Sequence, residues 1–361
     1  MRRGALDVGA ERRGRPEAGG GAGAPGEALR AGLFDRQGRR IRYLRLAVTD
    51  RCNLRCRYCM PAEGIAFAPR RELLSWPEML RLVAELTDAG IDKLRITGGE
   101  PFVRAGLVEW LGQVARLPNA PEVSITTNAT LIRPHVARLR DVGVRAVNVS
   151  LDALDAGGFF RITRRNLFDE VYANLLALVD AGLDVKVNCI VLDGQNADQL
   201  LDFVALTRKL PVDVRFLEEM PFNGSTGAGE ARGITWDHRR ILAHVRDAHP
   251  ELRRVPTAHP GQAAVNYAVP GHAGRVGIIA SYSRTFCGTC NRIRVNAKGE
   301  LRTCLYGDNV ASFAPALRGE DGDVSGAVRR VLAKALYERH TDGHAAEATH
   351  GRYASMTAIG G

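Results

Sequence analysis

The sequence predicts an α/β fold in which a parallel sheet curls into a partial (β/α) barrel of six units. Two patterns support this prediction. Short β-rich runs alternate with helical stretches from residue 43 onward. Candidate ligand residues also follow the carboxyl ends of several runs, where barrels place their sites. We expect three parts: an extension over residues 1–32, the barrel over 33–250 and a C-terminal domain over 251–361.

The predicted strands are short runs rich in β-branched and aliphatic residues. In chain order they are Tyr43–Val48, Lys93–Thr97, Glu122–Thr126, Arg145–Ser150, Asp184–Val191 and Val212–Leu217. Segments such as Trp76–Asp88 and Leu167–Asp180 have the apolar spacing of amphipathic helices. No apolar run reaches the roughly 18 to 20 residues that span a bilayer, and no hydrophobic segment adjoins the Arg-rich start. We therefore expect a cytoplasmic protein.

Charge is concentrated at the start of the chain. Residues 1–32 are rich in Gly, Arg and Ala without apolar periodicity, so we expect disorder there. The formal net charge is +10, and residues 1–45 hold 11 Arg against 5 acidic residues, a net of +6 that leaves +4 for the rest. A site for an anionic nucleotide explains that remainder better than a groove for nucleic acid.

Three cysteines, Cys52, Cys56 and Cys59, fall within eight residues with the spacing C-x3-C-x2-C. A closed cubane cluster uses four thiolates, so three indicate a [4Fe-4S] cluster with one iron open to a ligand. A zinc site with a distant ligand and a disulfide framework are the alternatives. No His precedes His135, and seven cysteines without a secretory signal favour a reducing compartment, so both alternatives are weaker.

This loop resembles the signature of the radical S-adenosylmethionine (SAM) superfamily, in which SAM chelates the open iron and is cleaved to a 5′-deoxyadenosyl radical. The resemblance implies an external low-potential reductant and a contact between Tyr58 and the SAM adenine. A second motif, Thr97-Gly-Gly-Glu-Pro101, follows a predicted strand. It resembles the superfamily's GGEP motif at the SAM amine, where Glu100 offers an acceptor for an ammonium group.

Cys287, Cys290 and Cys304 form another set of three, spaced C-x2-C-x13-C, which again implies a cluster with an open iron. The remaining cysteine, Cys189, lies in an apolar predicted strand and is expected to be a small buried hydrophobe. After Cys290, Arg292 and Arg294 alternate with apolar residues. Their guanidiniums therefore share one face, where planar forks bind phosphate or a nucleobase edge; the alternative is a solvated basic strand.

Together these motifs resemble the GTP 3′,8-cyclase family of molybdenum cofactor biosynthesis, over about residues 40–361. The resemblance implies an incomplete (β/α)6 TIM-like barrel of the radical SAM type, with a C-terminal extension that covers the open side and carries a second [4Fe-4S] cluster. It implies a lyase that removes the 3′ hydrogen of GTP and bonds the ribose to C8. The product is (8S)-3′,8-cyclo-7,8-dihydroguanosine 5′-triphosphate, and its formation is the first step of molybdopterin biosynthesis.

The same resemblance assigns site residues at matching positions. The implied SAM contacts are Tyr58, Gly99, Ser150 and Met220. The implied GTP contacts are Arg45, Arg95, Thr126, Lys186, Arg215, Arg292, Ile293 and Arg294. The implied catalytic residues are Arg292 and Arg294, with Gly360 and Gly361 as a tail that reaches into the site. The family often has Thr-Asn-Gly and Thr-Gly-Arg where this chain has Thr127-Asn-Ala129 and Thr163-Arg-Arg165.

For partners, the resemblance implies product handover to a cyclic pyranopterin monophosphate synthase and leaves a homodimer open, with no nucleic acid and no membrane. Two other functions stay open: a radical SAM enzyme that modifies peptides, and an electron-transfer protein with two clusters. The sequence assigns no chemistry to residues 307–320 and 338–350. The histidines of the second segment lack metal-ligand spacing and are expected to face solvent.

Overall fold

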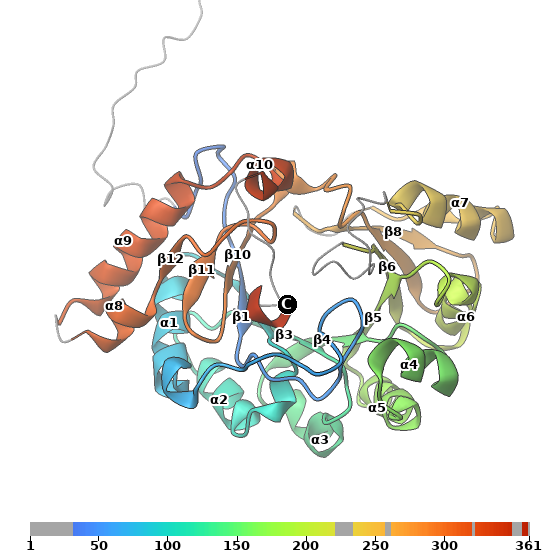
Figure 1. Cartoon of the computed structure of the whole chain (residues 1–361), viewed down its shortest axis with the longest axis horizontal. Helices are drawn as coiled ribbons and strands as arrows, with labels where there is room; N and C mark the ends of the chain where they lie inside the picture. The colour runs from blue at the N-terminus through green and yellow to red at the C-terminus, as the bar shows by residue number, and fades with distance from the viewer. Residues whose placement is uncertain (1–31, 221–233, 257–260, 320–321, 349–355, 360–361) are drawn as a thin grey trace, which may run out of the picture.

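The computed structural model describes residues 32–220, 234–256, 261–319, 322–348 and 356–359. Nearly all of the predicted N-terminal extension, and the tail residues Gly360 and Gly361, lie outside these ranges. Within the described chain, a 12-stranded sheet has the order β12-β11-β10-β1-β2-β3-β4-β5-β6-β9-β8-β7. The sheet curves around a central opening, with helices on its outer side (Figure 1).

The first six strands form the predicted parallel run, each beside its neighbour in sequence. They are β1 (Tyr43–Ala47), β2 (Lys93–Thr97), β3 (Glu122–Thr127), β4 (Val144–Ser150), β5 (Asp184–Val191) and β6 (Asp213–Glu218). No end of these strands differs from its predicted position by more than one residue. The partial barrel predicted from alternating β-rich and helical segments is confirmed.

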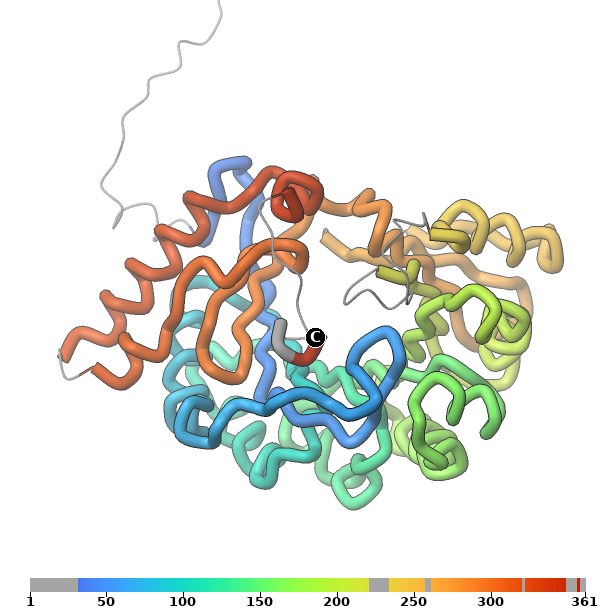
Figure 2. Tube along the Cα trace, in the orientation of Figure 1, coloured from blue at the N-terminus to red at the C-terminus, as the bar shows by residue number. Residues whose placement is uncertain are grey.

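Helices cross over between these strands and cover the outer face of the sheet (Figures 1 and 2). They are α1 (Trp76–Asp88), α2 (Leu107–Val114), α3 (Val136–Leu139), α4 (Ala156–Thr163), α5 (Phe168–Asp180) and α6 (Leu200–Lys209). Along β5 fully buried residues alternate with less buried ones, so Val185, Val187 and Cys189 lie in the hydrophobic core. Lys186 and Asn188 therefore point from the other face of the strand. Cys189 is fully buried, as predicted.

The C-terminal part of the chain lengthens the sheet at both edges. Strands β7 (Arg253–Arg254), β8 (Ala264–Ala268) and β9 (Arg275–Ile279) continue from β6 after α7 (His238–Ala248). Strands β10 (Arg292–Val295), β11 (Glu300–Arg302) and β12 (Ala311–Ser312) continue from β1. Because β9 and β10 pair in parallel with their neighbours, they extend the barrel wall itself. The sheet is thus continuous across residue 250, and the division there remains a prediction.

Three further helices follow β12: α8 (Ala314–Arg318), α9 (Val324–Tyr337) and α10 (Gly343–Glu347). Helices α8 and α9 pack on each other and on α1, and α9 also contacts β12. The short helix η7 (Met356–Ile359) lies within the central opening (Figures 1 and 2). None of the helices in the described ranges is both long and apolar enough to cross a membrane.

Two residues other than glycine take up the left-handed backbone conformation at the family's glycine positions. Ala129 has φ 60° and Arg164 has φ 58°, a region that favours glycine because it has no Cβ. Arg164 gains something in exchange, since its Nη1 donates to the carbonyls of Arg55 at 2.6 Å and Met60 at 3.3 Å. The substituted side chain thereby braces the first cysteine loop.

Candidate active site

The first cysteine loop and the Gly-Gly-Glu loop lie against each other at the carboxyl ends of β1 and β2. Gly99 N donates to Thr49 O at 2.9 Å, and Glu100 N donates to Arg51 O at 2.8 Å. A Cβ on Gly99 would clash with the backbones of Asp50 and Arg51, so the close approach requires glycine. The pairing of parallel strands therefore unites two motifs that are about 40 residues apart in sequence.

Glu100 does not offer the open acceptor for an ammonium group that the sequence predicted. Its side chain is fully buried, and its carboxylate accepts hydrogen bonds from Phe102 N, Thr127 Oγ1 and Asn128 N. The carboxylate thus ties the loop after β2 to the end of β3 and is not open to an ammonium group. What the loop presents instead is the partly exposed backbone of Gly98 and Gly99.

Cys52, Cys56 and Cys59 are partly buried, and none of the seven cysteines forms a disulfide. Burial raises the pKa of Cys52 to about 12 and holds the pKa of Cys56 well above its usual value. As thiolates they need a positive group between them. No three His, Cys, Asp or Glu side chains among the described residues converge on a single ion. Three thiols in one short loop fit the three ligands of a cubane cluster whose fourth iron is open.

The second cysteine set is assembled by the edge strands. Cys287 and Cys290 belong to the turn before β10, and the antiparallel partner strand β11 carries the chain to Cys304. Burial raises the pKa of Cys287. Burial also acts on Cys290, but Arg292 and Arg339 outweigh it and lower its pKa to about 7. A thiol held ready as a thiolate suits a metal ligand.

Between the two cysteine sets the inner face of the barrel is strongly cationic. Arg45 lies between Arg294 and Arg95 in the register of three neighbouring strands. Burial, followed by these two guanidiniums, holds the pKa of Arg45 well below its usual value. Burial likewise lowers the pKa of Arg215 and that of Arg294 to about 10 each. Such a surface favours an anionic ligand.

Several buried polar atoms on this face have no hydrogen-bond partner within the described chain. They are Nε of Arg45, Nε of Arg215, Nε and Nη2 of Arg292, and Oδ1 of Asn188 and Asn266. Buried polar groups are normally satisfied, so these donors and acceptors mark places where a ligand would complete the structure. The set mixes donors and acceptors, as recognition of a nucleotide requires.

Of the expected nucleotide contacts, the structure brings most to this inner face. Arg45, Arg95, Arg292 and Arg294 line one side of it, and Arg215 lies in register with Asn188 across the opening. Lys186 forms an ion pair with Asp184, and Thr126 is partly buried on β3. Ile293 differs, because its side chain is fully buried in the core on the opposite face of β10.

Of the expected SAM contacts, Gly99 lies beside the first cysteine loop, and Ser150 ends β4. Tyr58 donates its hydroxyl to Asp152 at 2.7 Å. Met220 follows β6, and its Sδ accepts from the Tyr306 hydroxyl at 3.0 Å. Tyr306 comes two residues after Cys304, so this contact joins the second cysteine set to the barrel. Met356 N, in η7, donates to Cys59 O at 3.3 Å, so the start of η7 lies beside the first cysteine loop.

Sequence reasoning missed several residues of this face. Asn188 alternates with Lys186 on β5, and Tyr43 alternates with Arg45 on β1, so the period of two could have found both. Asn266 gave no such signal. Its position follows from the register of the strands, since Asn266 and Arg215 both pair with Gly277. A Cβ on Gly277 would lie only 3.0 Å from either side chain, so the two side chains meet over this glycine.

The fold and the cysteine loop define an α/β enzyme of the radical SAM class, which carries an iron–sulfur cluster and SAM. Residues 46–207 match the family model "Radical SAM superfamily", and residues 212–345 match "Molybdenum Cofactor Synthesis C". Among solved structures, Streptococcus suis SuiB bound to S-adenosylmethionine aligns with a TM-score of 0.58 and 16% identity, covering 80% of this chain and 68% of SuiB. Native anSMEcpe with bound AdoMet aligns with a TM-score of 0.54 and 14% identity, covering 84% and 81%. These likenesses concern the fold alone.

The chain belongs to the GTP 3′,8-cyclase family. It is 37% identical over 337 residues to GTP 3′,8-cyclase of Alkaliphilus oremlandii, covering 91% of this chain and all of that protein. It is 37% identical over 310 residues to the mitochondrial GTP 3′,8-cyclase of Arabidopsis thaliana, covering 84% and 77%. Human molybdenum cofactor biosynthesis protein 1 is 40% identical over 293 residues, 79% of this chain and 44% of that protein. The chain thus spans about half the length of such animal relatives.

Proposed function

We propose that this protein is a GTP 3′,8-cyclase that forms (8S)-3′,8-cyclo-7,8-dihydroguanosine 5′-triphosphate from GTP, the first step of molybdenum cofactor biosynthesis. The observation that carries the proposal is the cationic inner face between two sets of three cysteines, where buried donor atoms of Arg45, Arg215 and Arg292 have no hydrogen-bond partner within the described chain. A triphosphate carries about four negative charges, and each charge-assisted contact contributes roughly 1.5 to 3 kcal/mol. The guanidiniums there are proportionate to such a ligand.

In this proposal Cys52, Cys56 and Cys59 hold the first cluster, and SAM lies against Gly99, Ser150 and Met220. When bound, the cluster and SAM supply the one-electron chemistry that the side chains cannot. The chain's own residues position and shield that chemistry. Arg164 and Asn128 brace the cysteine loop, since Asn128 Nδ2 lies 3.8 Å from Cys52 Sγ. The Tyr58 hydroxyl, bonded to Asp152, fixes the ring at the edge of the site.

For the substrate we assign Cys287, Cys290 and Cys304 to a second [4Fe-4S] cluster that anchors the guanine. Arg292 and Arg294 lie next to it and orient the base. Arg45, Arg95, Lys186 and Arg215 contact the phosphates, and Thr126 is assigned to the nucleoside. Ile293 contributes only its backbone, because its side chain faces the core. Holding the ribose near the SAM site converts an encounter into a positioned, effectively unimolecular step.

The proposal includes an external low-potential reductant and handover of the product to a cyclic pyranopterin monophosphate synthase. The tail formed by Gly360 and Gly361 is assigned to the active site. The contact of Met356 with Cys59 supports that assignment, because it leads the chain toward the first loop four residues earlier.

The deciding experiment is anaerobic and uses reconstituted full-length protein. We expect about eight irons per chain, four for each cubane, and SAM cleavage to 5′-deoxyadenosine that GTP stimulates, with the cyclic nucleotide as product. About four irons per chain would remove the second cluster from the proposal. An electron-transfer protein would not cleave SAM in response to GTP, and a peptide-modifying enzyme would cleave SAM without forming the cyclic nucleotide.

Cys304→Ala serves as the internal comparison. It should lower the iron content by about half, since each cubane holds four irons, and abolish cyclic product while slow SAM cleavage persists. Loss of all iron from this variant would show that the two sites do not form independently.

A further inference from the structure

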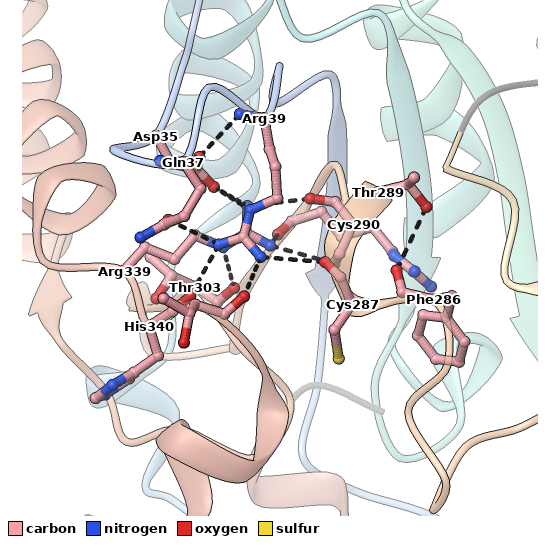
Figure 3. A network of polar contacts seen from close by, with 12 residues as sticks. Asp35, Gln37, Arg39, Phe286, Cys287, Thr289, Cys290, Thr303, Arg339 and His340 are labelled. Atoms are coloured by element: carbon pink, nitrogen blue, oxygen red, sulfur yellow. Dashed lines mark hydrogen bonds and ion pairs between the residues drawn. The ribbon is translucent and has the colours of Figure 1, made fainter.

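Arg339 lies in a segment to which the sequence assigned no chemistry. It follows the end of α9, and its side chain is only 3% exposed. Figure 3 shows its guanidinium among the residues around the second cysteine set. Nη2 donates to Cys290 Sγ at 3.2 Å and to Arg292 O at 3.3 Å. Nη1 donates to Cys290 O at 3.1 Å, and Nε donates to Thr303 O at 3.1 Å.

These contacts hold separate pieces of the site in one geometry. Cys290 ends the turn before β10, whereas Thr303 directly precedes Cys304 after β11. One planar fork therefore fixes two of the three cysteine backbones relative to each other. A lysine could not do this, because its ammonium is a point charge on a flexible stem.

Asp35 holds the guanidinium in place. Its carboxylate is 0% exposed and accepts from Arg339 Nη1 at 2.9 Å and from Arg39 Nε at 2.6 Å. Arg39 in turn donates through Nη1 to Cys287 O at 3.1 Å and through Nη2 to His340 O at 2.8 Å (Figure 3). Its Nη1 also donates to Thr341 O at 2.7 Å. Arg39, in the segment just before β1, thus contacts Cys287, the other cysteine of the turn before β10. Two guanidiniums share one buried carboxylate, which leaves a net positive charge beside the thiols.

We propose that Arg339 is a positioning residue of the second metal centre, which holds Cys290 and the bend that carries Cys304 in one geometry and raises the reduction potential of the cluster. The inference rests on the proposed second cluster. Reduction adds negative charge, and an N–H donor with a positive charge at a ligand sulfur stabilises the reduced state. Arg339 contacts the ligands and the strand that carries Arg292, so it acts on the reaction through them.

The test uses the full-length chain with Cys52, Cys56 and Cys59 replaced by Ala, so that only the second cluster forms. Two quantities are measured on the reconstituted protein: the midpoint potential from an EPR-monitored titration, and the rate of iron loss to a ferrous chelator. Arg339→Met should lower the midpoint potential and lose iron about 10 to 100 times faster. Arg339→Lys should keep a midpoint near the parent value, because the charge remains, yet still lose iron faster, because the fork is gone.

Arg330→Met is the matched control. It makes the same change on α9, but its side chain is 71% exposed and pairs only with Asp323 in the described contacts. Arg339→Met behaving like this control in both measurements would overturn the proposal. If the chain without the first three cysteines binds no iron at all, the second cluster itself is wrong, and the role of Arg339 falls with it.

A second variant covers the case in which Arg339→Met leaves Asp35 buried without a partner and does not fold. The pair Asp35→Asn and Arg339→Gln removes both buried charges together. It should lower the midpoint potential relative to Arg330→Met, because the donor charge at Cys290 is lost. A folded pair variant with the parent's potential would contradict the assignment.

Discussion

At the scale of single residues, the cationic side chains on the inner face of the barrel lower the stability of the ligand-free protein. Arg45 lies between two other guanidiniums, and its buried Nε has no hydrogen-bond partner among the residues that the structure describes. Like charges in register destabilise a sheet unless something lies between them. The side chains that we propose to bind the nucleotide therefore destabilise the ligand-free protein, and the nucleotide would relieve this repulsion. Removing one of them should stabilise the ligand-free fold and weaken nucleotide binding.

We predict that Arg45→Met raises the unfolding free energy of the ligand-free protein and weakens GTP binding about 10- to 100-fold, since one charge-assisted contact is lost. Thermal unfolding with and without GTP, together with calorimetric titration, measures both effects. Arg42→Met is the control, because Arg42 is exposed and pairs with Asp92 outside the site. A variant that loses stability and keeps GTP affinity would show that Arg45 is an ordinary structural residue.

At the scale of elements, the loops at the strand ends are tied together by buried carboxylates. Glu100 joins the loop after β2 to the end of β3, and Asp152, after β4, accepts from Tyr58 and from Ile190 N of β5. Burial outweighs these hydrogen bonds and raises the pKa of Glu100 to about 7 and that of Asp152 to about 6. These groups give the ligand-free protein a stability that depends on pH.

The sign follows from proton binding. The pKa of Glu100 is raised from 4.5 to about 7 on folding, so the folded state holds the proton more tightly than the unfolded state between these values. We predict that the unfolding free energy of the ligand-free protein falls as pH rises from about 4.5 to 7. The fall should amount to a few kcal/mol, because one pKa unit corresponds to about 1.4 kcal/mol.

Urea unfolding at steps of pH measures this dependence. Glu100→Gln should flatten it, leaving the smaller part due to Asp152, because an amide cannot ionise. Glu109→Gln, on the exposed side of α2, should keep the fall, because hydrogen bonds lower the pKa of Glu109 and its contribution to stability has the opposite sign. A parent profile that rises with pH over this range would contradict the assignment of a raised pKa to Glu100.

At the scale of the whole molecule, the segment before β1 contacts the surroundings of the second cysteine set. The core begins at Leu33, which is 1% exposed, and Asp35 and Arg39 reach the second cysteine set. The Arg-rich extension has no apolar periodicity, so we expect that truncation can separate it from the clamp formed by Asp35 and Arg39.

We predict that removing residues 1–32 leaves GTP affinity and turnover within a few-fold of the full chain, whereas removing residues 1–40 greatly accelerates iron loss from the second site. The shorter deletion spares the clamp formed by Asp35 and Arg39, and the longer one removes it. Calorimetric titration and chelator-driven iron release measure the two outcomes. RNA binding that survives the shorter deletion would favour a polymer-binding surface over the nucleotide site.

The sequence by itself determined the strand run, both cysteine sets and most cationic candidates. Alternation with a period of two and the chemistry of closely spaced thiols are local, and the same local geometry forms in the folded chain. Arg292 and Arg294 on β10 were found by this alternation, whereas Lys186 on β5 was assigned from the family resemblance. The Gly-Gly-Glu loop was found by motif, but the burial of its carboxylate was not, because hydrogen bonds to Thr127 and Asn128 depend on the neighbouring strand.

Only the tertiary structure decided the rest. The C-terminal strands join both edges of the barrel, which places Asn266 beside Gly277 and Arg215 beside the same glycine. Arg339 reaches Asp35, 304 residues away in sequence, and Cys290, 49 residues away. No pattern along the chain encodes such contacts, because sheet register and the path of α9 set them. Short-range periodicity fixes which face a side chain takes, and long-range strand pairing fixes what that face meets.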